Sequence, residues 1–296
     1  MKTKKWLDKF GCIVEGTPGE LLNGQVNPAE VLGLIEKYGV VLFRGFNASV
    51  ENFKDFGDSF PVRFGPYGGG ARHRPNITPD GTVFGASTGT HYICLHGEMY
   101  HHKNPPDLLW FHCELPSLEG GKTTLADGEE FTNELSPRLR ALFEENRVKY
   151  NFVTPKEVWK ASKPDLSAIE LLEAIKGTPE SDLISVLPDE SLSYEYVTSV
   201  FSSRNEKAYV NMVANCLQDN HKYATAGRPP VVFENDNVIG PEVIEELFAV
   251  ERRIIEEIVW ETGDFAILDN HRMMHGRSAF SGPRKVCSRI SYGLET

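Results

Sequence analysis

The sequence is poor in cysteine and has no paired cysteine motif. Its five cysteines are scattered, and none belongs to a Cys-x-x-Cys pair: Cys12, Cys94, Cys113, Cys216 and Cys287. An odd number of scattered cysteines argues against a disulfide framework and gives no support to a zinc site built from thiolates. We therefore expect reduced, mostly buried thiols in a reducing compartment, and we predict a cytoplasmic protein.

The sequence also lacks long apolar segments and an excess of basic residues. No run approaches the ~20 apolar residues that span a bilayer. Charged residues between Trp6 and Gly11 interrupt the apolar segment that a signal peptide would require. The net charge of −11 argues against a basic surface for nucleic acid or for an anionic membrane. We expect a soluble protein whose partner is a small molecule, and the sequence indicates no oligomeric state.

The composition is typical of a globular protein. Hydrophobic residues make up 40% of the chain and charged residues 25%, so a buried core can form. The sequence contains no repeat or heptad pattern, which argues against solenoid and coiled-coil folds. The glycine-rich segment 64–72 lacks the spacing of a phosphate-binding loop, and we expect a loop near the mouth of a site. We interpret residues 1–296 as one domain.

Short apolar segments predict a chain that is rich in strands. The segments 40–43, 108–113 and 265–268 are too short for helices and are expected to be buried strands, and similar runs continue between residues 83 and 126. A helix is predicted between Asn27, which can cap its first turn, and Gly39, which can close its last turn.

Further helices are predicted from Asp127 through Phe143 and from Pro241 onward. The second helix has an apolar face at helical spacing, formed by Ile244, Leu247, Phe248, Ile254, Ile255 and Ile258. The segment from about 155 to 200 contains proline and glycine breaks, and we interpret it as a helical, loop-rich insertion that forms part of a lid. The whole pattern favours a mainly β fold with added helices, a jelly roll (double-stranded β-helix), over alternating βαβ units.

The most informative segment for function is His96-Gly97-Glu98. In an extended chain alternate side chains lie on one face, so the imidazole of His96 and the carboxylate of Glu98 would point into one cavity. These groups are two of the three ligands of the facial triad that holds iron(II) in non-haem oxygenases. A His-x-Glu pair alone is a weak signal, because a surface pair in a strand is the commoner explanation.

A third ligand must come from another part of the chain. His275 closely follows the predicted strand 265–268, and Arg284 and Arg289 lie further along. An arginine near such a site would bind the distal carboxylate of a keto-diacid through two parallel hydrogen bonds. The segment after residue 268 is therefore the candidate source of both a metal ligand and an anion anchor.

The sequence resembles the taurine dioxygenase/TfdA-like superfamily of iron(II)- and 2-oxoglutarate-dependent oxygenases, particularly its clavaminate synthase-like and SyrP-like members. The matching segments occur in the family's order: His96-Gly97-Glu98, Gly120-Gly121-Lys122-Thr123, Tyr209-Val210-Asn211, Trp260-Glu261-Thr262-Gly263-Asp264, Asp269-Asn270, His275-Gly276-Arg277, Phe280, Gly282 and Arg284. These segments span residues 96–284, and the resemblance as a whole extends from about residue 40 to the C-terminus. Each segment alone is unspecific, but the ordered set is specific.

The resemblance implies a distorted jelly-roll core in which His96, Glu98 and His275 bind iron(II). Most taurine dioxygenase-type relatives carry Asp at the position of Glu98, and Glu is the clavaminate synthase-like variant. Related halogenases carry Ala or Gly there, which leaves room for chloride. A carboxylate at this position therefore argues against halogenation.

The same resemblance implies how the co-substrates bind. Thr123 and Arg284 correspond to the residues that bind the distal carboxylate of 2-oxoglutarate, and Arg289 matches a second arginine that approaches the co-substrate or the substrate. Dioxygen is the other co-substrate. The substrates of the family suggest that the substrate here is an amino acid, free or tethered to a carrier, or a related small acid in specialised metabolism. The expected outcome is hydroxylation, desaturation or cyclisation at an aliphatic C–H bond.

Two further residues are candidates for substrate contacts. Tyr92 would face the same cavity as His96 if the strand is regular. Arg72 belongs to the basic run 72–74, for which a solvated loop is the ordinary interpretation and contact with an acidic substrate is the alternative. His101 and His102 raise the possibility of a metal-dependent hydrolase or lyase, but no His-Glu-x-x-His helix is present. A binding protein that keeps the fold without turnover is the remaining alternative.

Overall fold

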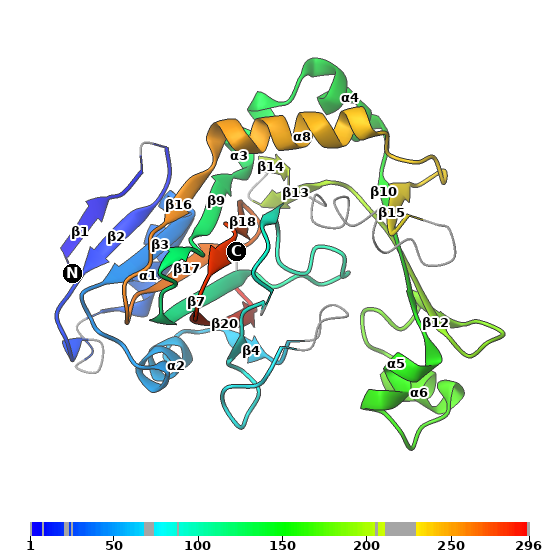
Figure 1. The fold of residues 1–296 in the computed structure, drawn as a ribbon, viewed down its shortest axis with the longest axis horizontal. Helices are drawn as coiled ribbons and strands as arrows, with labels where there is room; N and C mark the ends of the chain where they lie inside the picture. Colours follow the sequence, from blue (N-terminus) through cyan, green and yellow to red (C-terminus); the bar gives the residue numbers. More distant parts are fainter. Residues whose placement is uncertain are drawn as a thin grey trace.

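Two sheets face each other at the centre of the molecule (Figure 1), and their strands are antiparallel except for the parallel pair β2 and β3. The computed structural model describes residues 2–7, 9–20, 24, 26–67, 74–87, 89–204, 207–210 and 229–294. The larger sheet has the order β1 (Lys2–Lys5), β2 (Cys12–Glu15), β3 (Val40–Arg44), β17 (Phe265–Asp269), β7 (Leu108–Leu115), β20 (Lys285–Tyr292) and β4 (Arg63–Gly65), and β5 (Phe84–Gly85) also pairs with β20. The smaller sheet has the order β16 (Glu256–Ile258), β9 (Thr123–Asp127), β18 (Met273–Arg277) and β6 (Ile93–His96).

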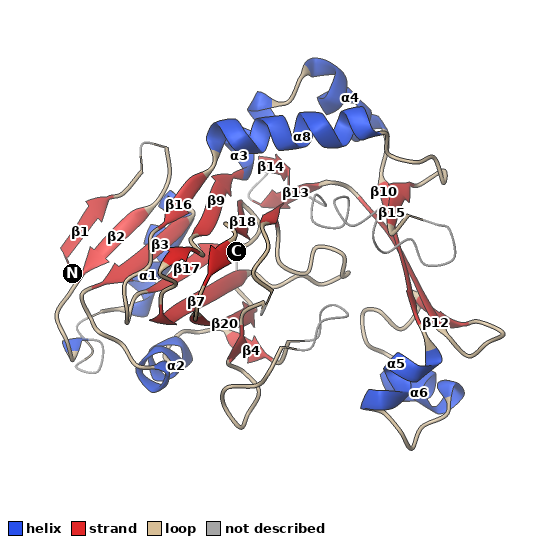
Figure 2. Ribbon diagram, viewed as in Figure 1, coloured by secondary structure: helices blue, strands red, loops and turns tan. Residues whose placement is uncertain are grey.

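Helices cover the outer faces of both sheets (Figure 2). The described helices are α1 (Pro28–Tyr38), α2 (Val50–Asp58), α3 (Gly128–Glu134), α4 (Pro137–Glu145), α5 (Lys156–Ser162), α6 (Ala168–Ile175) and α8 (Pro241–Ile254). α1 and α2 pack on the larger sheet, whereas α3, α4 and α8 pack on the smaller sheet. Within the described residues, we find no helix with both the length and the apolar character that a membrane span requires.

The alternation of side chains along the strands divides the core into layers. Leu42 of β3 and Ala266 of β17 point toward the smaller sheet and pack with Leu125 of β9. Their chain neighbours Val41 and Phe265 point the other way, against α1 and α2. Because consecutive strand residues face opposite sides, the larger sheet is buried on both faces, which explains its short apolar strand sequences.

Local signals predicted α1 and β3 correctly. The side chain of Asn27 accepts a hydrogen bond from the backbone N–H of Ala29, and Gly39 closes α1 with a φ of 75°. The buried strand predicted after this glycine is confirmed as β3. Four cysteines are buried as expected, namely Cys12, Cys94, Cys113 and Cys287, and Cys216 lies outside the described residues.

Two predicted helices differ from the structure. The helix expected from Asp127 through Phe143 is two helices, because Leu135 is extended and Pro137 starts α4. The helix from Pro241 ends at Ile254, and Ile258 belongs to strand β16. In both cases apolar side chains at helical spacing continue past a backbone break, because the flanking segment packs on the same core.

The segment predicted as a helical insertion contains strands as well as helices. A third sheet has the order β11 (Ile184–Val186), β12 (Leu192–Thr198), β10 (Val148–Thr154) and β15 (Val231–Phe233). In Figure 1, α5 and α6 lie at the right of the view, away from the two central sheets. Two two-stranded sheets complete the described strands: the hairpin of β13 (Phe201–Arg204) with β14 (Lys207–Val210), and the pair of distant strands β8 (Glu119–Gly120) and β19 (Phe280–Ser281).

Candidate metal centre

The pairing of β18 with β6 places two histidines side by side. His275 and His96 are cross-strand partners, and the centroids of their imidazole rings lie 4.3 Å apart. β18 also pairs with β9, so its place in the sheet is set from both edges. Gly276 allows the close approach of the strands, because a Cβ there would lie 2.4 Å from the carbonyl oxygen of Ile93.

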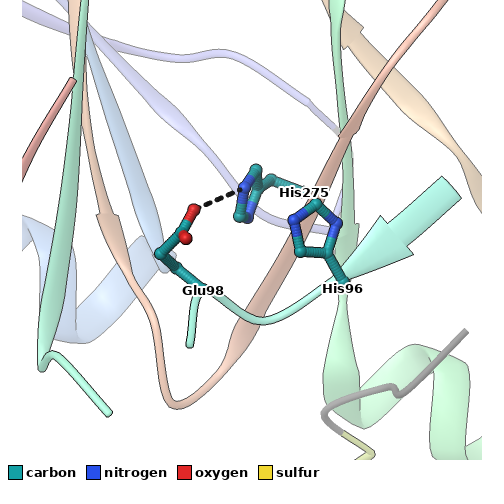
Figure 3. Close-up of side chains that lie close together, drawn as sticks. All are labelled: His96, Glu98 and His275. Carbon is teal, nitrogen blue, oxygen red and sulfur yellow. Dashed lines mark ion pairs between the residues drawn. The ribbon is translucent and has the colours of Figure 1, made fainter. Parts of the chain in front are cut away.

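Glu98 joins these histidines from the turn that follows β6 (Figure 3). The strand ends at His96, so Glu98 does not lie in it as the alternation argument expected. The turn, in which Met99 adopts a φ of 58°, brings the carboxylate back toward the imidazoles. One ligand atom from each of His96, Glu98 and His275 lies within 4.8 Å of the others, and Oε2 of Glu98 is 3.5 Å from Nε2 of His275.

The side chain of Asn270 holds the backbone of Glu98 in place. Its Oδ1 accepts a hydrogen bond of 2.8 Å from the N–H of Glu98. Its Nδ2 donates to the carbonyl oxygens of Glu98, at 3.0 Å, and of Pro106, at 2.8 Å. The structure shows that these bonds reach across the chain to a candidate metal ligand.

Burial and neighbouring charges set the protonation of the group. Burial lowers the pKa of His96 to about 3, so the ring is neutral. Its Nδ1 lies 2.9 Å from the carbonyl oxygen of Cys94, which leaves Nε2 unprotonated if Nδ1 donates this bond. Burial alone would raise the pKa of Glu98, but Arg74 and His275 outweigh it and hold that pKa well below its usual range.

These properties fit a divalent metal ion. Two neutral imidazoles and one carboxylate are a donor set suited to iron(II), and on one side of an ion they leave adjacent positions open. Donors about 2.1 Å from a common ion at right angles are about 3 Å apart, which the observed separations allow. Among the histidine, cysteine and acidic side chains of the described residues, His96, Glu98 and His275 are the group that lies close enough together to hold a metal.

A buried carboxylate on α8 supports the strand that carries His96. β6 is at the edge of its sheet, so the N–H groups on its outer side need other partners. Glu251 accepts a hydrogen bond of 3.3 Å from the N–H of Leu95 and another from the hydroxyl of Tyr92. The prediction that Tyr92 faces the metal cavity is therefore wrong. β6 begins at Ile93, so the alternation does not extend to Tyr92, which packs against α8.

Thr123 and Arg284 lie close together at one end of β9. The Nε of Arg284 donates 2.9 Å to the carbonyl oxygen of Gly121, two residues before Thr123. The indole N–H of Trp260 donates to the Thr123 hydroxyl at 3.0 Å, which leaves the hydroxyl proton available for an acceptor. Burial lowers the pKa of Arg284 to about 10, and within the described chain no acidic side chain forms an ion pair with it. The pair suits a carboxylate ligand.

Arg289 lies on the other face of the larger sheet. Its guanidinium group is buried against α2, where it bonds to Asp58 and, at 2.8 Å, to the carbonyl oxygen of Lys54. It also lies over the ring of Phe64. The prediction that Arg289 approaches the co-substrate is therefore corrected, because alternation along β20 turns its side chain away from the metal-binding face.

The loop before β5 contributes a residue that the sequence analysis did not single out. Arg72 lies outside the described residues. Arg74, from the same basic run, has its Nη2 at 3.6 Å from Oε1 of Glu98. No sequence signal separates Arg74 from Arg72, because the loop path decides which side chain turns inward.

Two facing sheets with two histidines and a carboxylate between them are the arrangement of non-haem iron oxygenases. Residues 16–290 match the taurine catabolism dioxygenase TauD, TfdA family, and the chain belongs to this family. It is therefore an enzyme of the non-haem iron(II)- and 2-oxoglutarate-dependent dioxygenase class, as the sequence indicated. The enzymes of this class act on small-molecule substrates.

Two curated relatives and three solved structures are similar over most of their lengths. A clavaminate synthase-like protein of Arabidopsis thaliana is 24% identical, with 87% of this chain and 82% of the relative covered. The tyrosine isonitrile desaturase of Erwinia amylovora is 20% identical, with 92% and 82% covered. The PvcB protein of Pseudomonas aeruginosa has a TM-score of 0.59 at 17% identity, with 99% and 92% covered.

A second structure of PvcB, an iron- and α-ketoglutarate-dependent oxygenase from an isonitrile synthetic pathway, gives a TM-score of 0.58 at 18% identity, with 99% of this chain and 92% of that chain covered. A taurine dioxygenase from Burkholderia xenovorans gives 0.60 at 15% identity, with 99% and 89% covered. These similarities confirm the predicted jelly roll with added helices.

We predict that Asn270→Ala weakens metal binding by about tenfold to a hundredfold, as is usual when support of a ligand is lost. The variant removes three hydrogen bonds, two of them to the backbone of Glu98. Asn270→Asp is the informative comparison, because it keeps an acceptor for the N–H of Glu98 but loses both donors. Titration of the metal-free proteins with Mn(II) would measure the effect. Wild-type affinity in both variants would show that the Asn270 bonds do not position Glu98.

We predict that Arg289→Met lowers the free energy of unfolding by about 2–3 kcal/mol, because it removes buried charge-assisted hydrogen bonds. Affinity for 2-oxoglutarate should be unchanged. Denaturant unfolding and calorimetric titration with 2-oxoglutarate test the two parts, with the exposed Arg63→Met as control. A loss of 2-oxoglutarate affinity at wild-type stability would restore the original assignment of Arg289.

Proposed function

We propose that this chain oxidises an aliphatic C–H bond of a small substrate derived from an amino acid, in specialised metabolism, with His96, Glu98 and His275 as the iron ligands. The observation that carries the proposal is the convergence of these three side chains from β18, the end of β6 and the turn that follows it, with Glu98 and His275 buried and His96 partly buried. Iron(II), when bound, would bring 2-oxoglutarate and dioxygen together, with dioxygen as the oxidant and 2-oxoglutarate as the donor of two of the four electrons that its reduction needs. The chain itself positions the co-substrate and the substrate and excludes water.

The residues of the site divide this work. His96 and His275 offer neutral nitrogen donors, and Glu98 offers one negative charge. Arg284 and Thr123 bind the distal carboxylate of 2-oxoglutarate, the guanidinium through charge-assisted hydrogen bonds and the hydroxyl through its free proton. The carboxylate of Glu98 occupies the position that a chloride would need, so the site favours hydroxylation, desaturation or cyclisation over halogenation.

The named relatives support the substrate class. The similar tyrosine isonitrile desaturase and the PvcB structures belong to isonitrile chemistry on small molecules. Both relatives are distant, so the substrate of this chain is assigned only as a small molecule derived from an amino acid. The cytoplasmic location expected from the buried thiols remains a part of this proposal.

We further propose that the chain is one oxygenase domain in which the segment from about 155 to 200 acts as a lid. This segment contacts the loop directly after Glu98. The hydroxyl of Tyr194 donates 2.7 Å to the carbonyl oxygen of His101, and Lys103 pairs with Asp182 at 3.2 Å. A lid that contacts the loop after Glu98 can change its position when the substrate binds beside the metal.

We predict that the wild-type protein with iron(II) in air converts 2-oxoglutarate to succinate and CO₂, faster when a substrate is present. His275→Ala should lose this activity, whereas His91→Gln, at an exposed histidine, should keep it. Succinate formation with a panel of amino acids and tyrosine isonitrile, followed by product mass, measures the outcome. Full turnover by His275→Ala would contradict the ligand assignment, and metal-dependent hydrolysis without succinate would contradict the reaction class.

We predict that Arg284→Met raises the KM for 2-oxoglutarate by about tenfold to a hundredfold, because a charge-assisted bidentate contact is lost. Arg284→Lys should be intermediate, since it keeps the charge but not the planar fork. Affinity for Mn(II) should stay at the wild-type value in both variants. An unchanged KM in Arg284→Met would show that another group binds the distal carboxylate.

A further inference from the structure

Arg74 lies directly beside a candidate metal ligand. Its Nη2 is 3.6 Å from Oε1 of Glu98, and its side chain is only 15% exposed. The other carboxylate oxygen of Glu98, Oε2, faces His275. A separation of 3.6 Å is longer than a hydrogen bond, so Arg74 pairs with Glu98 by charge and is not tied to it by a direct bond.

Aromatic side chains hold the guanidinium group over the inner face of the larger sheet. Its carbon Cζ lies 4.1 Å from the ring centroid of Tyr67 and 5.8 Å from that of Phe84. Phe111, whose ring is 5.4 Å from the imidazole of His275, lies on the same face. Arg74 and the metal ligands therefore lie together on the inner face of the larger sheet.

A second polar group on this face has no acceptor or donor beside it. Ser288 of β20 is paired in register with Phe84 on one side and Phe111 on the other, so its side chain lies between these two rings. Its hydroxyl is fully buried and has no hydrogen-bond partner within the described part of the chain. Buried hydroxyls normally have partners, so the hydroxyl of Ser288 is an unusual polar group on this otherwise apolar face.

With a metal ion and 2-oxoglutarate bound, the site would carry one more positive charge than negative charges. A divalent metal, Arg74 and Arg284 carry four positive charges, whereas Glu98 and 2-oxoglutarate carry three negative charges. The histidines contribute none, because a ligand imidazole is neutral. A net charge among largely buried groups is costly, and one additional carboxylate would remove it.

We propose that Arg74 binds a carboxylate of the substrate beside the metal, and that the enzyme thereby selects substrates with one negative charge near the oxidised carbon. This inference rests on the proposed function. It gives Arg74 the substrate-facing role that the sequence analysis placed on Arg72 and Arg289. A guanidinium with five N–H donors, of which the described neighbours use few, can bind both carboxylate oxygens.

Binding of paired probes tests the proposal without relying on turnover. The protein is loaded with Mn(II) and 2-oxoglutarate, and probe binding is measured by calorimetric titration. The probes are free and N-acetyl amino acids with aromatic, aliphatic or polar side chains. Each acid is compared with the matching amide, in which an uncharged carboxamide replaces the carboxylate. The wild type should bind the acid of the preferred pair about tenfold to a hundredfold more tightly than the amide. Arg74→Met should lose this preference, and Arg74→Lys should keep part of it.

Controls separate the possible causes. Arg63→Met removes an exposed arginine that lies over Tyr292, and it should behave as the wild type. Mn(II) and 2-oxoglutarate affinities are measured for every variant. Equal binding of acid and amide to the wild type, or binding of neither, overturns the proposal, as does an unchanged preference in Arg74→Met. A loss of 2-oxoglutarate affinity instead would assign Arg74 to the co-substrate, and a loss of Mn(II) affinity alone would make it a support for Glu98.

The same measurements distinguish failure of this proposal from failure of the proposed function. A wild-type protein that binds neither Mn(II) nor 2-oxoglutarate contradicts the proposed function itself. A wild-type protein that binds both, with no role for Arg74 in acid preference, contradicts only the present inference. Thermal unfolding of each variant shows whether it is folded. If Arg74→Met does not fold, the acid preference of Arg74→Lys, which keeps the charge, still tests the proposal.

Discussion

The register between β6 and β18 is the constraint on which the candidate site depends. It makes His96 and His275 cross-strand partners. A slip of one residue would turn His96 to the opposite face of the sheet. β18 is held from both sides, but β6 is an edge strand and needs support from outside the sheet. Glu251 bonds to its outer backbone, and Gly276 lets the two strands approach closely.

Charge balance in a buried space is the second constraint. Burial keeps His96 neutral, while Arg74 and His275 keep Glu98 ionised in spite of its burial. Arg284 remains charged at neutral pH although burial lowers its pKa to about 10. The site therefore combines neutral nitrogen donors with one carboxylate and two cations. A metal ion and anionic ligands complete this arrangement, which agrees with the family to which the chain belongs.

Elements with strong local signals were predictable, and those that depend on contacts between distant segments were not. Helix α1 has a cap at Asn27 and a closing Gly39, which are readable without any tertiary contact. The break at Leu135 was missed because apolar spacing continues across it. Strand β12 was missed because its pairing with β10 joins segments separated by two helices, and no periodicity in the insertion records that pairing.

The sequence by itself determined the chemistry of the candidate site: the side-chain types of the proposed ligands His96, Glu98 and His275, and their order relative to Arg284. Side-chain identity and family order are properties of the chain alone. Only the tertiary structure decided which arginines meet the site. Arg289 is turned outward onto α2 by strand alternation, whereas a loop path that no motif records turns Arg74 toward Glu98. The direction of a side chain depends on the register and packing of its neighbours, which one-dimensional patterns do not contain.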